Sequence, residues 1–452
     1  MKRLVFCFDG TWNRLDAEFS TNVVLTAESV LPLTVDNTAQ VVFYDEGVGT
    51  AKHEYFRGGI FGAGLVKNMA DGYRFLIFNY TPGDEIYVFG FSRGAYTARS
   101  FVGLIHTCGI LQRGFASRVN AAIELYRKRD VSASFNEEVL CFRRDNSPDI
   151  CVTTDEQQWR VKAGLPSQNA PLLNIHYLGV WDTVGALGIP TRFAIAKELD
   201  KKFLFHDISL TAFVKSARHA IAIDERRKDF VPTLWDNTDE LNMAAKADPT
   251  AGDAPYQQKW FPGVHSSVGG GGERRGLSDQ SLDWILDGAR AAGLVLDPQD
   301  SSRIFELKPD YTDFIDNSTT PSLYYRVANW LAAADRHPGP SALHEISMSA
   351  QRRWLEDPKH LKDGVRYRPH TLDRVRPELD RLDPARFGLG QAAVGNAQYD
   401  MYEVKRGDQL RVIAKTLLGS PDLADRIYKA NLDKIDSIDR IYPGQMLRIP
   451  KD

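Results

Sequence analysis

Cysteine is scarce in this chain of 452 residues, and its few copies show no paired spacing. The four are Cys7, Cys108, Cys141 and Cys151, and two of them lie within apolar stretches. A disulfide framework or a cysteine zinc site needs closely spaced pairs, so this pattern excludes both classes. We expect buried free thiols, no metal site and no cofactor.

Long hydrophobic runs are also missing, although 43% of the residues are hydrophobic and suffice for a large core. No stretch reaches the roughly 18 apolar residues of a membrane-spanning helix. The amino terminus lacks a secretion signal, because Met1-Lys2-Arg3 leads directly into a core strand and Asp9 interrupts the apolar run. We therefore expect a chain made in the cytoplasm that is exported, if at all, by a route that reads no such peptide.

A strong charge of one sign is absent too. Lysine and arginine total 56 and aspartate and glutamate total 59, so the net charge is only −3. Proteins that bind nucleic acid or anionic lipid through their whole surface carry a large positive excess. The composition therefore excludes such global binding, and we expect no nucleic-acid partner.

The most informative feature that is present is the segment 86–99, where strand formers end in Gly90-Phe91-Ser92-Arg93-Gly94. A serine on a sharp strand-to-helix turn needs small residues two before and two after it, so that the backbone closes without clashes. Apolar residues at helical spacing follow. The pattern predicts a nucleophile elbow with Ser92 as nucleophile; the alternative is an ordinary glycine-rich turn with a solvated serine.

Candidates for an orienting acid and a general base follow the elbow in the order that α/β-hydrolases use. Asp182 ends the apolar run 175–181, where a carboxylate can face a cleft instead of the core. His265 stands between an apolar stretch and four glycines, and we expect it on a mobile, accessible loop. Two alternatives stay open: Asp182 merely caps the next turn, or His219 is the base, although its segment 217–224 has helical spacing.

Hydrolysis at a serine also needs amide donors for the oxyanion. One is Arg93, the residue after the nucleophile, and further candidates are Gly10 and Thr11 in the turn after the first strand. A plain Asp-Gly turn explains the same residues without any catalytic part. The amino-terminal segment also looks like the first motif of haloacid-dehalogenase-type phosphatases. Because Cys7 occupies the position of their nucleophilic aspartate, that class of enzyme is a distant alternative.

Four motifs follow one another along the chain: Phe8-Asp9-Gly10-Thr11-Trp12-Asn13, Gly90-Phe91-Ser92-Arg93-Gly94-Ala95, Val180-Trp181-Asp182-Thr183-Val184-Gly185 and Trp260-Phe261-Pro262-Gly263-Val264-His265. Together they resemble the first family of type VI secretion lipase effectors, over roughly residues 1–380. The resemblance implies an α/β-hydrolase that cleaves phospholipid acyl esters, with Ser92, Asp182 and His265 as its triad. In one departure, Ser267 replaces the aspartate usual in the family's histidine motif, so activity is weakened or retuned if that acid orients the loop or the base.

The carboxy-terminal segment reads strand, helix, helix, strand, and it resembles a LysM domain. The resemblance implies binding of N-acetylglucosamine glycans such as peptidoglycan. Gly407 and Asp408 turn the chain into the first helix, Gln409 stands where threonine is usual, and Asn431 opens a polar loop, so we expect a sugar groove at these four residues. The alternative is a packing domain without a ligand.

These predictions give one organisation: a hydrolase domain over 1–386, a glycine- and alanine-rich linker over 387–400, and a LysM domain over 401–452. The fold class expected is α/β, with helical cap insertions over 111–170 and a small βααβ module. We expect a serine ester hydrolase, specifically a phospholipase that acts as a secreted antibacterial effector. It would be made in the bacterial cytoplasm, exported to the periplasm or wall of a target cell, and anchored there to peptidoglycan. Its partners would include secretion-apparatus and immunity proteins. The alternatives are a wall-associated esterase of acylated glycan and a non-catalytic wall-binding scaffold.

Overall fold

The structure is a computed structural model, and it describes residues 1–10, 17–47, 59–128, 137–166, 169–185, 209–227, 230–297, 305–316, 336, 339–387, 389, 399–405, 408–431, 435, 438, 441 and 446–451. Within these residues, none of the helices combines the length and the apolar character needed to cross a membrane. Packing divides the chain into two compact units, residues 1–217 with 229–241 and residues 218–228 with 242–452. Most of the predicted linker 387–400 lies outside the described residues.

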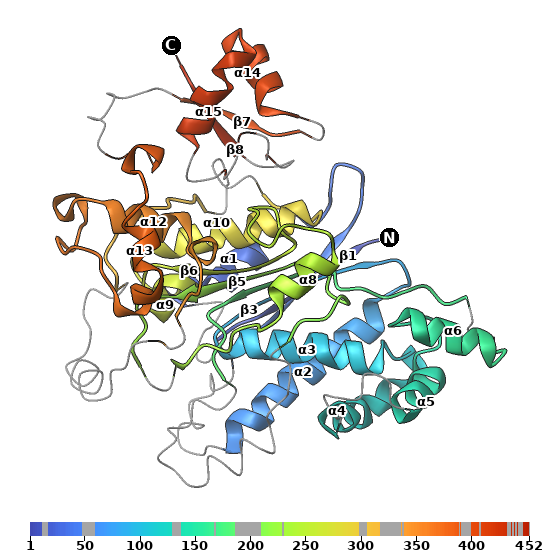
Figure 1. Cartoon of the computed structure of the whole chain (residues 1–452). Helices are drawn as coiled ribbons and strands as arrows, with labels where there is room; N and C mark the ends of the chain where they lie inside the picture. Colours follow the sequence, from blue (N-terminus) through green and yellow to red (C-terminus); the bar gives the residue numbers. More distant parts are fainter. Residues whose placement is uncertain are drawn as a thin grey trace. The chain divides into compact units, whose positions relative to one another are not determined.

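The first unit is built around a parallel sheet, in which β1 and β3 are labelled in Figure 1. The strand order within this unit is β2-β1-β3-β4. The strands are β1 (Arg3–Phe8), β2 (Gln40–Asp45), β3 (Glu85–Phe91) and β4 (Tyr177–Trp181). Strands β1, β3 and β4 are almost entirely buried, as expected for apolar runs in a parallel sheet covered on both faces. The register pairs Phe8 with Gly90 and Phe91 with Trp181, so the carboxyl ends of neighbouring strands lie at one edge.

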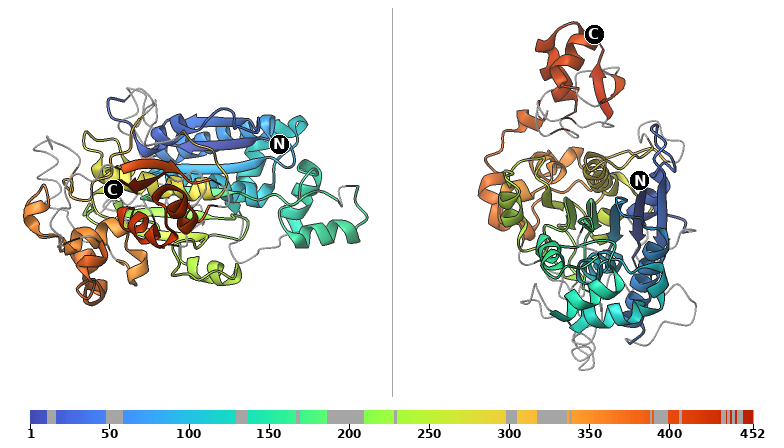
Figure 2. Two further views of the ribbon diagram at one scale, coloured as in Figure 1. Left: turned by 90° about the horizontal axis from the view of Figure 1, so that it is seen from above. Right: turned by 90° about the vertical axis from the view of Figure 1, so that its right-hand side faces the viewer.

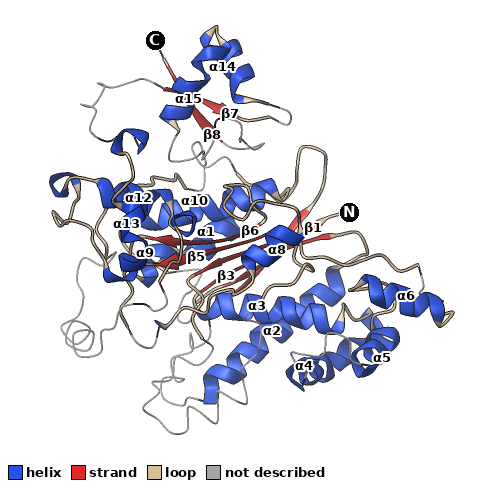
Figure 3. Ribbon diagram, viewed as in Figure 1, coloured by secondary structure: helices blue, strands red, loops and turns tan. Residues whose placement is uncertain are grey.

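Three helices of this unit pack against the sheet: α1 (Asn22–Ser29), α2 (Gly59–Asn79) and α3 (Arg93–Cys108) (Figure 3). Aromatic rings join the sheet to α2 and α3. The ring of Phe6 lies 5.8 Å from Phe75 on α2 and 4.7 Å from Phe101 on α3, between centroids. Both helices therefore cover the same face, and this packing fixes the start of α3, which follows Ser92 directly.

The predicted helical insertions over 111–170 are present as η1 (Arg113–Arg118), α4 (Val119–Lys128), α5 (Glu137–Asn146) and α6 (Thr154–Lys162). A buried ion cluster holds the last two together. Glu156 accepts from Arg143 at 2.9 Å and from Arg160 at 2.5 Å. Arg143 also donates to the carbonyl of Thr107 near the end of α3, at 2.8 Å. Because a buried charge without its partner is very costly, this cluster fixes the insertions to α3.

In the second unit, β5 (Ala217–Ala222) lies next to β6 (Tyr256–Phe261). The helices are α9 (His265–Gly269), α10 (Gly276–Ala291), η3 (Leu343–Glu345), α12 (Met348–Leu355), η4 (Pro358–His360), η5 (His370–Val375), α13 (Arg376–Leu379) and η6 (Pro384–Phe387). Helix α8 (Thr238–Ala244) precedes β6 in the chain. The helical prediction for 217–224 was wrong: the segment contains β5, and a strand buried on both faces has no polar alternation to distinguish it from a short helix.

The carboxy-terminal module has the predicted order of elements: β7 (Tyr399–Glu403), α14 (Leu410–Leu418), η7 (Pro421–Leu423), α15 (Ala424–Ala430) and β8 (Met446–Pro450). Strands β7 and β8 pair antiparallel, and the two helices lie on one side of them (red in Figure 2). The module has a hydrophobic core of its own, which includes Leu410, Ile413, Ile427 and Leu447. The amphipathic pattern of α14 supplies a third of the buried residues of that core, Leu410, Ile413 and Ala414, and helps so short a segment to fold into this arrangement.

Candidate active site

Ser92 lies between β3 and α3 with φ 60° and ψ −123°, a conformation that residues with a side chain rarely adopt. Strain of this kind persists where the surroundings fix it, and the nucleophile elbow is one such place. Here the amide of Ser92 donates to the carbonyl of Trp181 on β4, at 3.0 Å. The strand-turn-helix context predicted for Ser92 is therefore present, and its role as nucleophile stays a prediction.

The two glycines of the elbow have no room for a side chain. A Cβ on Gly94 would lie 2.2 Å from the carbonyl oxygen of Phe8 and 2.4 Å from that of Asp9. A Cβ on Gly90 would lie 2.6 Å from the carbonyl oxygen of Gly94. Both clashes are with backbone atoms, which cannot rotate away. The spacing of the Gly-x-Ser-x-Gly pattern thus follows from close packing of the elbow against the end of β1.

Asp182 directly follows β4, and Trp181 before it pairs with Phe91 at the end of β3. Ser92 and Asp182 therefore leave adjacent strands at the same edge of the sheet. Asp182 is fully buried and has φ 37°, a left-handed conformation that aspartate tolerates better than most residues because its short side chain can bond locally. Its predicted position at a strand end is confirmed, and its part in a triad stays a prediction.

The carboxylate of Asp9 organises the turn after β1. It accepts hydrogen bonds from the amide of Gly10 at 2.6 Å, from the hydroxyl of Thr21 at 2.6 Å and from the hydroxyl of Tyr44 at 2.9 Å. Gly10 thus donates to the neighbouring side chain, which disagrees with the prediction that its amide faces the nucleophile. The physical reason is that a carboxylate one residue earlier competes locally for the amide. Thr11 lies outside the described residues.

Arg93, the other predicted oxyanion donor, is the first residue of α3. The amides of a first helical turn point along the axis from the positive end of the helix dipole. That orientation suits a developing oxyanion, because a negative charge is stabilised there. The predicted role of the Arg93 amide is therefore compatible with its position.

His265 is the first residue of α9 and only 6% exposed, so the prediction of an accessible loop position was wrong. Its amide donates to Oε2 of Glu225 at 3.2 Å. The same carboxylate accepts from the guanidinium of Arg227 at 2.8 and 2.7 Å. Burial alone would raise the pKa of Glu225, but the bonds and charge of Arg227, with the charge of His265, hold that pKa below its ordinary value. An ionised Glu225 beside His265 favours the protonated imidazole that a general base becomes.

Asp224, the preceding residue, holds the same segment. Its Oδ2 accepts from the amide of Gly263 at 2.7 Å and from the hydroxyl of Tyr367 at 2.8 Å. Burial raises the pKa of Asp224 to about 6. Asp224 and Glu225 thus fix the two ends of the segment 263–265. The sequence prediction missed both residues, and the available signal was a pair of acids just after a strand.

Ser267, which departs from the family motif, is buried and donates from Oγ to the carbonyl of Ile315 at 2.7 Å. The amide of Val264 reaches the same carbonyl at 3.3 Å. An ionised aspartate could not donate this bond. In this chain, therefore, a hydroxyl anchors the segment around His265 where an acid is usual.

His219, the competing base, lies within β5 and is fully buried. Its Nδ1 lies 3.0 Å from Oε1 of Gln258. A histidine in this position is typical of a hydrogen-bonded core residue, and the choice of His265 as the base stays a prediction.

The structure accounts differently for the residues predicted to bind glycan. Gln409 is exposed at the start of α14. Asp408 accepts from the hydroxyl of Tyr402 and the amide of Lys405, both at 2.8 Å, so it closes the turn before that helix. Asn431 is fully buried and its amide group bonds to the backbone of Ile427 and Arg448, which disagrees with direct sugar contact. Gly407 lies outside the described residues.

The cysteines are free thiols, and three of the four are buried. Burial, and next the charge of Asp9, raise the pKa of Cys7 far above its ordinary value, so the thiolate is disfavoured beside the elbow. In the part of the chain that the structure describes, no group of three or more histidine, cysteine, aspartate or glutamate residues is arranged to hold a metal ion.

Ser92 lies in a strained strand-to-helix turn on a parallel sheet, and the next strand ends in a buried aspartate. This arrangement is typical of serine ester hydrolases. Comparison with protein families agrees. The family described as T6SS, phospholipase effector Tle1-like, catalytic domain, matches residues 2–288, and the chain belongs to this family. A LysM domain spans residues 402–450.

Curated relatives match parts of the chain. An uncharacterized protein of Saccharomyces cerevisiae is 28% identical over 244 residues, which cover 51% of this chain and 32% of the relative. The potassium binding protein Kbp of Escherichia coli O6:H1 is 47% identical over 51 residues, which cover 11% of this chain and 34% of the relative. The chain thus spans about a third of the length of each of these relatives.

Two solved structures are similar at low TM-scores. One is the Tle1 effector bound to the VgrG spike of a type 6 secretion system, with TM-score 0.32 and 17% identity over 60% of this chain and 51% of that one. The other is an uncharacterized protein from Pseudomonas aeruginosa, with TM-score 0.39 and 14% identity over 98% of this chain and 75% of that one.

Proposed function

We propose that the chain is a serine hydrolase that cleaves an acyl ester of phospholipids, with Ser92 as nucleophile, His265 as general base and Asp182 as orienting acid. The observation that carries this proposal is the elbow. The backbone of Ser92 is strained, and the backbone packs closely around Gly90 and Gly94; an ordinary solvated turn serine requires neither feature. The substrate class follows from membership in a phospholipase effector family.

The reaction follows acyl-transfer chemistry. Ser92 Oγ attacks the ester carbonyl while His265 takes its proton, and the oxyanion is stabilised by the amide of Arg93 at the start of α3. The C–O bond of the ester breaks, His265 returns the proton to the leaving lysophospholipid alcohol, and water then hydrolyses the acyl enzyme by the same route. Asp182 keeps the imidazole in the tautomer that accepts from serine.

Asp224 and Glu225 act in this proposal as positioning residues. They accept hydrogen bonds from the backbone of the segment that bears His265. Glu225 adds an electrostatic part, because its ionised carboxylate stabilises the imidazolium that forms during attack. Ser267 supplies the remaining anchor through Ile315, so its presence does not by itself imply a degenerate site.

We further propose that the LysM domain anchors the enzyme to peptidoglycan through N-acetylglucosamine. The match to the LysM family supports glycan binding, and exposed Gln409 at the start of α14 remains available for a sugar. Family membership also supports delivery by a type VI secretion apparatus from the bacterial cytoplasm to the periplasm or wall of a target cell, with an immunity protein in the producer.

The second candidate is an esterase that deacylates cell-wall glycan, and the LysM domain is the observation that favours it. Purified protein separates the two: the phospholipase releases long-chain fatty acid from phospholipid vesicles, and the glycan esterase releases acetate from acylated peptidoglycan. A wall-binding scaffold without catalysis releases neither.

A further inference from the structure

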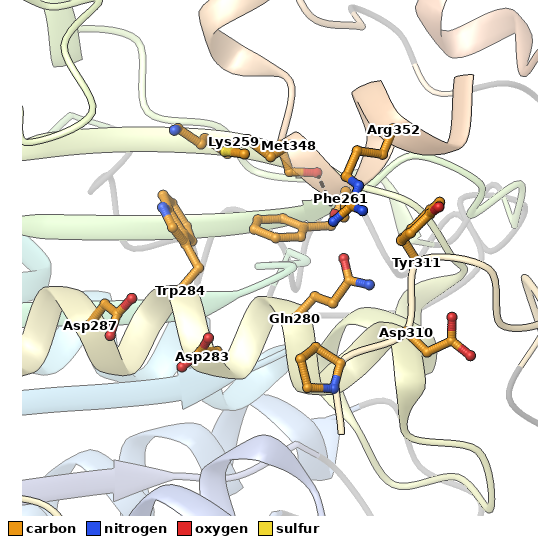
Figure 4. Close-up of a pocket in the computed structure, with 13 residues that line it drawn as sticks. Lys259, Phe261, Gln280, Asp283, Trp284, Asp287, Asp310, Tyr311, Met348 and Arg352 are labelled. Carbon is orange, nitrogen blue, oxygen red and sulfur yellow. Dashed lines mark hydrogen bonds between the residues drawn. The ribbon is translucent and has the colours of Figure 1, made fainter. Parts of the chain in front are cut away.

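A pocket of about 210 Å³ lies within the second unit, between β6, α10 and the start of α12. Figure 4 shows Arg352 and Tyr311 at one end of it and Asp287 at the other, with Phe261 and Gln280 between them. None of the three proposed catalytic residues lines it. Its size is below the roughly 300–1,000 Å³ of pockets for drug-sized ligands, so it suits a small group.

Arg352 is the unusual member of this lining. Its guanidinium lies 4.5 Å from the centre of the Tyr311 ring, and within the described residues no carboxylate forms an ion pair with it. Its Nε is buried and has no hydrogen-bond acceptor there. The Nε of its neighbour Arg353 is also buried without an acceptor, but the guanidinium of Arg353 pairs with Asp363 at 2.6 Å.

The site around Arg352 is preorganised. The hydroxyl of Tyr311 donates to Oε2 of Glu356 at 2.5 Å, so the ring is a fixed platform under the guanidinium. A guanidinium stacked on a ring keeps the N–H groups at its edge for an oxyanion. Ser347 and Ser349 add hydroxyls 2.9 Å apart at the start of α12, where the helix dipole also favours negative charge.

Three carboxylates line the same pocket, and two cations outside the lining pair with them. Asp310 pairs with Lys362 at 2.9 Å. Asp283 and Asp287 lie 3.9 and 2.7 Å from Arg290. Within the described residues Arg352 forms no ion pair, Lys259 adds a second cation to the lining over the ring of Trp284, and the nearby carboxylates disfavour a dianion. A singly charged anion attached to a small organic group fits best.

We propose that this pocket binds the phosphate group of a small organic phosphodiester. The headgroup of a glycerophospholipid is the source that follows from the proposed function, on which this assignment of the ligand rests. Arg352 holds the phosphate oxygens with the hydroxyls of Ser347 and Ser349, and Phe261 and Met348 contact the organic part. The pocket is thus a headgroup subsite separate from the elbow serine.

The test uses the full chain carrying Ser92→Ala, which binds lipid without turning it over. Glycerophosphoethanolamine and inorganic phosphate are titrated by calorimetry, and vesicles of phosphatidylethanolamine are sedimented with the protein. The variant is Arg352→Gln, and the matched control is Arg374→Gln, which removes the same charge from an exposed side chain. We expect at least a tenfold loss of glycerophosphoethanolamine affinity in Arg352→Gln and none in the control, with equal melting temperatures.

Absence of saturable glycerophosphoethanolamine binding, or equal affinity in Arg352→Gln and the parent, overturns the inference. Binding of inorganic phosphate with no affinity for glycerophosphoethanolamine overturns the headgroup assignment in favour of a free-phosphate site. Since binding is read without catalysis, the result is independent of the proposed reaction. In the chain with Ser92 intact, Arg352→Gln should raise KM on vesicles, whereas Arg374→Gln should leave it unchanged.

Discussion

Replacing Gly94 by alanine tests the geometry of the elbow without changing any group that reacts. The new Cβ would lie 2.2 Å from the carbonyl oxygen of Phe8 and 2.4 Å from that of Asp9, so either the end of β1 or the start of α3 must move. Overpacking of this kind costs about 1–3 kcal/mol. For a unit of this size that is a fall in melting temperature of about 2–12 °C.

The effect on turnover should exceed the effect on stability. A displacement of about 1 Å at a reacting group costs roughly a hundredfold in rate. The assay is hydrolysis of a short-chain ester by protein whose melting temperature is measured in parallel. Gly114→Ala is the matched control, because no atom lies within 4 Å of its added Cβ. If Gly94→Ala melts and turns over like Gly114→Ala, the close packing inferred for the elbow is refuted.

Three further outcomes are expected. His265→Ala should remove nearly all ester turnover at unchanged melting temperature, whereas His219→Ala should chiefly lower the melting temperature; similar losses of turnover in two equally stable variants would overturn the choice of base. Glu225→Gln should shift the acid limb of the kcat/KM profile to lower pH, by up to about one unit, because loss of the anion lowers the pKa of the imidazolium; an unchanged profile would contradict the electrostatic role. Residues 400–452 alone, which contain a core of their own, should sediment with purified peptidoglycan while residues 1–390 stay in the supernatant; retention of the larger fragment would place wall binding elsewhere.

The parts of this structure that sequence predicts well are those governed by neighbours in the chain. The Gly-x-Ser-x-Gly spacing predicts the elbow because the turn itself requires small residues, and Asp182 is found at a strand end because a buried strand is visible as an apolar run. The order of elements in the carboxy-terminal module follows from amphipathic patterns for the same reason.

Where sequence predicts the surroundings of a residue wrongly, those surroundings depend on contacts between distant segments or on competition for hydrogen bonds within a turn. Glu225 reaches His265 across 40 positions, which no local pattern encodes. Asn431 resembles a loop residue in sequence, yet its amide joins the backbone of Arg448, which is 17 positions away. Gly10 was expected to face the nucleophile, but the adjacent carboxylate of Asp9 captures its amide. His265 was expected on an accessible loop because glycines follow it, whereas its surroundings bury it.

The central claim is that Ser92 performs ester hydrolysis, and fatty-acid release from phospholipid vesicles by the full chain and by its Ser92→Ala variant tests it most directly. Alanine removes only the attacking oxygen, so melting temperature and peptidoglycan binding should stay the same. Release of fatty acid should therefore fall on the order of a thousandfold or more. A folded Ser92→Ala protein that releases fatty acid at a rate close to that of the parent would contradict the claim.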